Sequence, residues 1–147
     1  MDVYTRRSRG WHLSRHWDQL LTLTALQRAL AQHRPEIYHA DQGVQYAATL
    51  STQMLQAQGV QISMATGGEA TEHGHAERLM RTMKAEKVRL HDYADFHAAY
   101  QQIGRFLDDV YQHKRIPSAL GYLTPAAVET QWLHQQSMAI SDKLAPP

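Results

Sequence analysis

The chain has 147 residues, of which 43% are hydrophobic and 20% charged, and its formal net charge at pH 7 is +1. This length fits one domain of ordinary size, and the composition is that of a globular protein. The chain contains no cysteine, which excludes a disulfide framework, a thiolate zinc site and a cysteine nucleophile.

No stretch approaches the ~18 consecutive apolar residues of a membrane span. Residues 1–7 lack the apolar segment of a secretory signal. We therefore expect a cytoplasmic protein without a membrane segment. The near-neutral net charge neither favours nor excludes a nucleic-acid partner, so the local charge pattern must decide.

Short strands and helices alternate in the first part of the chain. Residues 3–5 and 11–13 are β-prone segments around a turn, which predicts a hairpin. Asp18 is a typical N-cap for a helix that ends before Pro35, because the residue before a proline disfavours helical backbone. Residues 36–39 then form a short strand.

A second helix is predicted over residues 46–57, with Gly59 as its stop, followed by a strand over 60–64. Residues 65–71 contain Gly67-Gly68 and indicate a loop. A long helix over 72–90 follows. The inward positions of the second helix are predicted to be Tyr46, Leu50, Met54 and Leu55.

The last part of the chain is predicted to be helical. A helix over residues 95–113 is followed by a break at 116–118 and by a helix from Thr124-Pro125 to about Trp132. Residues 133–147 form a C-terminal tail beyond a core of residues 1–132, and 137–147 are expected to fray. The inward side chains of the 95–113 helix are predicted to be Phe96, Ala99, Tyr100, Ile103, Phe106, Leu107 and Val110. The element order predicts an α/β fold with a mixed sheet.

Two carboxylates stand out as candidate metal ligands. Asp41 comes just after a strand, where open α/β sheets place ligand-binding groups. Glu77 lies near the start of the long helix, and 35 residues (42–76) separate the two. Two simpler interpretations stay open: Asp41 belongs to an ordinary turn, and Glu77 complements the helix dipole or pairs with Arg81.

Basic residues accompany Glu77 along the same helix. Arg81 and Lys84 share its face, and Arg78 adjoins it. A metal-binding carboxylate beside a basic track suits a phosphodiester substrate. The Lys114-Arg115 pair either contacts phosphate or stabilises a helix C-terminus.

A histidine-based zinc site is a weaker alternative. His73 and His75 lie near Glu72 and Glu77. Residues two positions apart do not share a helix face, and no HExxH motif is present. Mg²⁺ prefers carboxylates and water, so the carboxylate pair favours a magnesium site.

Four segments resemble the integrase core domain of bacterial insertion-sequence transposases, a group similar to retroviral integrases. The resemblance extends from Met1 to about Trp132. The segments are Asp2-Val3-Tyr4-Thr5-Arg6-Arg7 with Gly10-Trp11; His39-Ala40-Asp41-Gln42-Gly43-Val44-Gln45-Tyr46; Gly74-His75-Ala76-Glu77-Arg78-Leu79-Met80-Arg81-Thr82-Met83-Lys84; and Lys114 through Ala126.

The resemblance implies a ribonuclease-H-like fold and a D-D-E catalytic triad. Asp41 is then the second acid and Glu77 the third, and both bind metal. Two Mg²⁺ (or Mn²⁺) ions would promote cleavage and transfer of DNA strands. Lys84 corresponds to the family lysine that contacts the DNA at the end of the element. The implied partners are transposon-end and target DNA, and the implied location is the bacterial nucleoid.

The resemblance also carries departures. The family's first Asp lies on a strand before the one that matches Asp2, so we expect the first acid and the central strand to be missing from this N-terminally truncated chain. The family's helix-turn-helix region is missing too. His73 replaces a usual Asn, and Pro117 replaces a usual His.

These departures predict that the chain alone has little or no catalytic activity. Without the central strand, unpaired strand edges and apolar side chains favour association, either with a second copy or with full-length transposase. The alternative function is a DNA-binding or transposase-interacting remnant without catalysis.

Overall fold

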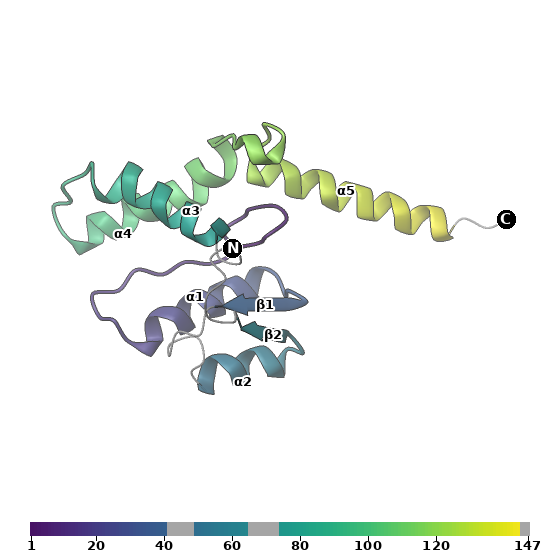
Figure 1. Ribbon diagram of the computed structural model, residues 1–147, viewed down its shortest axis with the longest axis horizontal. Helices are drawn as coiled ribbons and strands as arrows, with labels where there is room; N and C mark the ends of the chain where they lie inside the picture. Colours follow the sequence, from purple (N-terminus) through teal and green to yellow (C-terminus); the bar gives the residue numbers. More distant parts are fainter. Residues whose placement is uncertain (41–48, 65–73, 145–147) are drawn as a thin grey trace. The chain divides into compact units, whose positions relative to one another are not determined.

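The computed structural model describes the backbone of residues 1–40, 49–64 and 74–144, and side chains as far as residue 140. The chain divides into two compact units. Unit 1 comprises Met1 and residues 9–90, and unit 2 comprises residues 2–8 together with 91–147. Helices make up most of the described structure (Figure 1).

Unit 1 contains a strand–helix–strand arrangement that follows a first helix. Its elements are α1 (Gln19–Gln32), β1 (Ile37–Ala40), α2 (Thr49–Ala57) and β2 (Gln61–Met64). The two strands pair in parallel, with Ile37 opposite Gln61 and Ala40 opposite Met64. A parallel pair needs a crossover connection, and the segment that contains α2 provides it.

The core of unit 1 lies between the helices and the strand pair. Leu26 of α1, Leu55 of α2 and Val60 before β2 form a buried cluster. Leu55, predicted to point inward, is only 1% exposed, whereas the prediction for Leu50 was wrong because its side chain is 52% exposed. Tyr46 lies outside the described residues. The partly buried side chains packed on this cluster are Leu30, Tyr38, Met54 and Ile62.

Helix boundaries in unit 1 follow the predicted signals. The Asp18 carboxylate accepts a hydrogen bond from the Leu21 backbone N–H at 3.2 Å and caps α1. Gly59 has a φ of +67°, the left-handed conformation that commonly ends a helix and that glycine adopts without strain. These predicted boundaries are confirmed.

The predicted N-terminal hairpin is wrong. Residues 3–5 and 11–13 contain no strand. The Asp2 backbone N–H instead donates to the Arg7 carbonyl oxygen at 2.8 Å, and the Asp2 carboxylate accepts from the Thr5 N–H at 2.7 Å. The Asp2 side chain thus satisfies backbone groups locally, in competition with strand pairing.

The long helix of unit 1 consists of α3 (Gly74–Met83) and a π-helical continuation, η1 (Lys84–Val88). This confirms the predicted helix over its described residues. None of its side chains is buried. Two large apolar side chains of this helix, Met80 and Val88, are 47% and 45% exposed.

Unit 2 is helical apart from its N-terminal segment. Its elements are α4 (Phe96–Arg105), the π-helix η2 (Phe106–Lys114), the 3₁₀ turn η3 (Ser118–Leu120) and α5 (Pro125–Leu144). Asp95 caps α4 by accepting from the Ala98 N–H at 2.7 Å. The buried hydrophobic side chains of α4 and η2 are Ile103, Phe106, Leu107 and Tyr111. The first three of these were predicted to point inward.

The C-terminal helix is longer than predicted. Thr124 caps α5 through its hydroxyl oxygen, which accepts from the Ala127 N–H at 3.2 Å. The helix continues to Leu144, so the predicted end near Trp132 was wrong. No proline or glycine interrupts residues 126–144, and Gln, Ala, Met and Leu are adequate helix formers. The division into a core of residues 1–132 and a tail of 133–147 stays a prediction.

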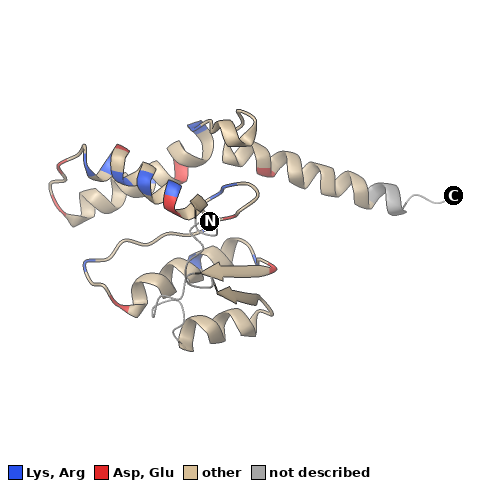
Figure 2. Ribbon diagram, viewed as in Figure 1, with Lys and Arg blue, Asp and Glu red and all other residues tan. Residues whose placement is uncertain are grey.

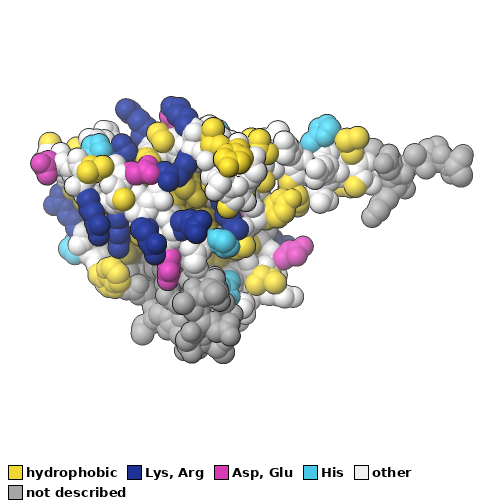
Figure 3. Space-filling view, turned by 45° about the horizontal axis from the view of Figure 1, so that its top comes forward, with side chains coloured by type: hydrophobic (Ala, Val, Ile, Leu, Met, Phe, Trp, Pro, Cys, Tyr) yellow, Lys and Arg dark blue, Asp and Glu magenta, His cyan; other side chains and the backbone are white. Residues whose placement is uncertain are grey.

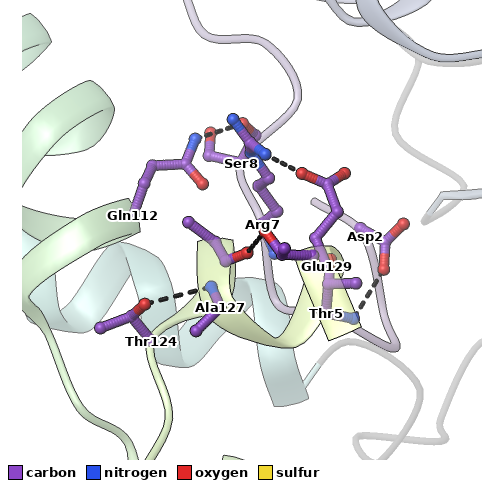
Figure 4. A network of polar contacts seen from close by, with 10 residues as sticks. Asp2, Thr5, Arg7, Ser8, Gln112, Thr124, Ala127 and Glu129 are labelled. Carbon is purple, nitrogen blue, oxygen red and sulfur yellow. Dashed lines mark hydrogen bonds and ion pairs between the residues drawn. The ribbon is translucent and has the colours of Figure 1, made fainter. Parts of the chain in front are cut away.

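Residues 2–8 belong to unit 2 through polar contacts with helices distant in sequence (Figure 4). The Gln112 side-chain N–H donates to the Ser8 carbonyl oxygen at 2.7 Å, in a buried position. Arg7 forms an ion pair with Glu129 of α5. Thr5 is only 3% exposed. These contacts hold the N-terminal turn against η2 and α5.

The α/β class holds in its coarse form, helices with a small sheet. Over residues 1–40, 49–64 and 74–144 that sheet has two parallel strands, and the mixed ribonuclease-H-like sheet without its central strand stays a prediction. Within the same ranges no helix is long and apolar enough to cross a membrane.

Candidate metal and nucleic-acid site

The first candidate carboxylate, Asp41, lies outside the described residues. The strand that leads to it is described: β1 ends at Ala40, which is 6% exposed. At this edge of the strand pair, the His39 ring Nδ1 and the Ser63 hydroxyl lie within hydrogen-bonding distance, 3.1 Å apart. The carboxyl ends of β1 and β2 therefore lie side by side, and Asp41 is the residue that follows β1 in the chain.

The second candidate carboxylate, Glu77, lies in the first turn of α3 and is exposed. Among the described residues its side chain forms no ion pair, with Arg81 or any other base. The alternative of a Glu77–Arg81 pair is therefore not realised in this structure. The first-turn position still complements the helix dipole, and the carboxylate oxygens stay open to a further ligand.

The basic residues of this helix are also exposed. Arg78, Arg81 and Lys84 form no ion pair within the described part of the chain, and Figure 2 shows their helix banded in blue. The π-helical turn begins at Lys84, whose carbonyl oxygen accepts from the Arg89 N–H at 2.9 Å. Such turns are wider than α-helical ones and frequently occur at functional sites.

The Lys114-Arg115 pair belongs to unit 2, at the end of η2. The Lys114 ammonium donates a hydrogen bond of 2.6 Å to the Asp109 carboxylate. This hydrogen bond holds the pKa of Asp109 below its ordinary value, and nearby basic side chains act in the same direction. Lys114 is therefore already partnered by an acid, although both side chains are exposed to solvent.

Sequence analysis missed this pairing because residues five positions apart do not meet on an α-helix. In η2 the hydrogen-bond pattern widens by one residue, as in the Arg115 N–H that donates to the Val110 carbonyl oxygen at 2.9 Å. Asp109 and Lys114 then come together. A sequence signal for π-helix would have been needed to find them.

A multi-ligand metal centre is not visible in the part of the chain that is described. There, no group of three or more His, Asp or Glu side chains could hold a metal ion. Asp41 and His73 are outside that part, and His75 is exposed on α3. Glu77 is thus the described member of the predicted metal site. Its carboxylate offers oxygen atoms, the ligand type that hard divalent cations prefer.

Lys and Arg side chains also reach the surface elsewhere on the chain (Figure 3). Arg78, Arg81 and Lys84 place exposed positive charge on α3 and at the start of η1. Comparison with known families shows to which class of protein the chain belongs.

Two family models, both described as integrase core domain, match the chain, one over residues 1–70 and the other over residues 58–125. The chain belongs to the integrase core family, in the form found in insertion-sequence transposases.

Two curated relatives give the comparison in detail. A "Transposase for insertion sequence element IS904" from Lactococcus lactis subsp. lactis (strain IL1403) is 28% identical over 132 residues, covering 88% of this chain and 52% of the relative. The "Insertion element IS600 uncharacterized 31 kDa protein" of Shigella sonnei is 28% identical over 139 residues, covering 92% of this chain and 51% of the relative. The chain thus spans about half the length of each.

Proposed function

We propose that this chain acts in DNA transposition, as part of a site for metal-dependent cleavage and transfer of DNA strands. Asp41 and Glu77 hold a divalent ion, Mg²⁺ or Mn²⁺. The observation that carries the proposal is the exposed Glu77 carboxylate, which has no ion pair among the described residues and lies within the integrase core match at 58–125. The name of the Lactococcus relative supports the same function.

The metal ion and the residues of α3 and η1 have different roles in this proposal. A bound divalent ion polarises a phosphate oxygen and lowers the pKa of water. The Glu77 carboxylate offers oxygen ligands at the start of α3. Arg81 and Lys84, on the same helix, bind neighbouring phosphates by charge, which fixes the DNA backbone without reading its sequence.

Two carboxylates provide too few oxygen ligands for this chemistry. Two-metal phosphoryl transfer holds ions about 4 Å apart with several oxygen ligands. Asp41 and Glu77 bind metal weakly and do not fix both ions. The isolated 147-residue polypeptide therefore shows little or no strand cleavage, and catalysis needs a further acid.

A second candidate function needs no catalysis. The chain binds DNA, or joins a second copy or a full-length transposase. The observation that favours DNA binding is the exposed set Arg78, Arg81 and Lys84, none of which is neutralised by an ion pair in the described ranges. Sedimentation of the isolated chain, alone and with full-length transposase, tests the association. A monomer under both conditions contradicts it.

One experiment tests both functions. Anisotropy of labelled duplex DNA measures binding from about 50 mM salt upward, and a nicking assay with Mg²⁺ follows cleavage. We expect salt-dependent binding whose log–log slope falls by about two units in Arg81→Ala/Lys84→Ala. Arg105→Ala, an exposed charge on α4, serves as the control. Absence of binding at about 50 mM salt rejects a role on DNA.

The nicking arm separates catalysis from binding. Little or no nicking is expected from the isolated chain. Nicking that Glu77→Gln abolishes would overturn the predicted inactivity and keep the role of Glu77. Nicking that persists in Glu77→Gln would contradict that role.

A further inference from the structure

The second half of helix α5 is exposed on all sides. Every residue from 130 to 140 is exposed, and in Figure 1 this half of α5 lies apart from the other helices of unit 2. A helical segment of this length is marginal in water without tertiary contacts. It nevertheless presents large apolar side chains to solvent: Trp132, Leu133 and Ile140 are 36%, 52% and 58% exposed.

These three side chains continue the buried face of α5. Pro125 is fully buried, and Glu129, four positions on, is 9% exposed. Positions 3, 4, 7 and 11 after Glu129 lie on the same face of an α-helix. The residues at these positions form the α5 stripe: Trp132, Leu133, Gln136 and Ile140. The face that packs within unit 2 in the first half of α5 is therefore exposed to solvent in the second half.

The charge pattern indicates which partner fits the α5 stripe. Residues 130–141 contain no Asp, Glu, Lys or Arg. Helices that bind DNA or lie on membrane surfaces do so largely through Lys and Arg, so neither partner matches this segment. A strongly charged protein surface would find no complementary charge here. An uncharged helix face does match, and a second copy of this chain supplies one without like-charge repulsion.

We propose that the α5 stripe pairs with the α5 stripe of a second copy, as an antiparallel helix pair with two-fold symmetry. This deepens the association named as the second candidate function and needs no role on DNA. With Gln136 at the two-fold axis, Trp132 of each copy lies beside Ile140 of the other, and the helix dipoles oppose each other. Residues 130–140 span roughly 16 Å. The contact is therefore smaller than a standard interface, and the dimer should dissociate in the micromolar range.

Leu133→Glu/Ile140→Glu tests the α5 stripe. Both side chains are exposed, so the double variant should fold normally, which circular dichroism checks. Sedimentation from about 1 to 100 µM should show a monomer–dimer equilibrium for the wild-type chain, and the double variant should raise the Kd about 10-fold or more. Gln131→Glu/Met138→Glu is the matched control. It adds the same two charges at exposed positions on the opposite side of the helix, and it should dimerise like the wild type.

Cysteine crosslinking tests the orientation, because the chain has no cysteine of its own. Gln136→Cys should form a disulfide-linked dimer under mild oxidation, since the two copies of this residue meet at the two-fold axis. Gln135→Cys, which lies off the α5 stripe, should form far less.

Three results would overturn the proposal. They are a wild-type chain that stays monomeric at about 100 µM, a dimer that persists in Leu133→Glu/Ile140→Glu, and equal crosslinking of the two cysteine variants. The second result would leave the association itself standing and move it to another surface. The DNA and metal titrations test the proposed function separately.

Discussion

The side chain of Gln112 donates a hydrogen bond of 2.7 Å to the carbonyl oxygen of Ser8, 104 positions earlier in the chain. Both residues are buried, at 5% and 8% exposure. A buried carbonyl oxygen without a donor is expensive. This contact therefore makes the N-terminal turn an integral part of unit 2, although nothing in its local sequence indicates a partner on η2.

Gln112→Met should lower the free energy of unfolding by about 1–3 kcal/mol, because it keeps the volume but leaves the Ser8 carbonyl unsatisfied. Urea unfolding followed by circular dichroism measures the change. Gln102→Met is the matched control at an exposed position of α4. Equal losses in the two variants would show that the hydrogen bond contributes nothing.

The Arg7–Glu129 ion pair should be coupled energetically. The two side chains are 27% and 12% exposed, so the pair is less screened by water than a surface pair. Arg7→Met, Glu129→Gln and the double variant form a cycle, for which we expect a coupling of about 1–2 kcal/mol. Strictly additive losses would argue that the ion pair does not attach the N-terminal turn.

Gly10→Ala should destabilise unit 1 by about 1–3 kcal/mol. A Cβ at this position would lie 2.4 Å from the Ala25 carbonyl oxygen and 2.6 Å from the Ala29 backbone nitrogen, so α1 must shift. Gly74→Ala is the control, since a Cβ there meets no atom within 4 Å. Thermal unfolding compares the two. A wild-type Tm for Gly10→Ala would contradict the close packing against α1.

Asp109→Asn should strengthen DNA binding about 2- to 5-fold at low salt, because it releases Lys114 and removes a negative charge. Asp108→Asn removes the same charge without touching the Lys114 partner and should give a smaller gain. Anisotropy titrations compare the variants. Identical gains would mean that the Asp109–Lys114 pair does not restrain Lys114.

Acid should have the same effect as Asp109→Asn. The Lys114 hydrogen bond lowers the pKa of Asp109 below 3.8. A carboxyl group whose pKa is lower in the folded than in the unfolded chain stabilises the fold above its unfolded pKa. That stabilisation is lost as the pH falls through its folded pKa. The pair therefore persists at neutral pH and opens only as the pH falls through the lowered pKa of Asp109.

The sequence predicted the elements whose signals are local. Helix ends were found where one residue marks them through its own side chain or backbone. These residues are Asp18, Gly59, Asp95 and Thr124. The buried positions Ile103, Phe106 and Leu107 follow helical periodicity. The assignment to the integrase core rests on motifs rather than on packing, and the family matches confirm it.

The remaining features depend on distant or unusual geometry. Strand formation at residues 3–5 needs a partner strand, and the turn closed by Asp2 forms instead. The Gln112–Ser8 contact spans 104 positions, and the Asp109–Lys114 contact requires a π-helical turn. The pairing of Asp41 with Glu77 stays a prediction from spacing, because Asp41 lies outside the described residues.

Metal titration of Glu77→Gln tests the central claim most directly. Calorimetric titration of the 147-residue chain with Mn²⁺ and Mg²⁺ should show weak binding. That binding should vanish in Glu77→Gln and persist in Glu36→Gln, an exposed carboxylate elsewhere in unit 1. Undiminished binding in Glu77→Gln, or equal loss in both variants, would contradict Glu77 as a metal ligand.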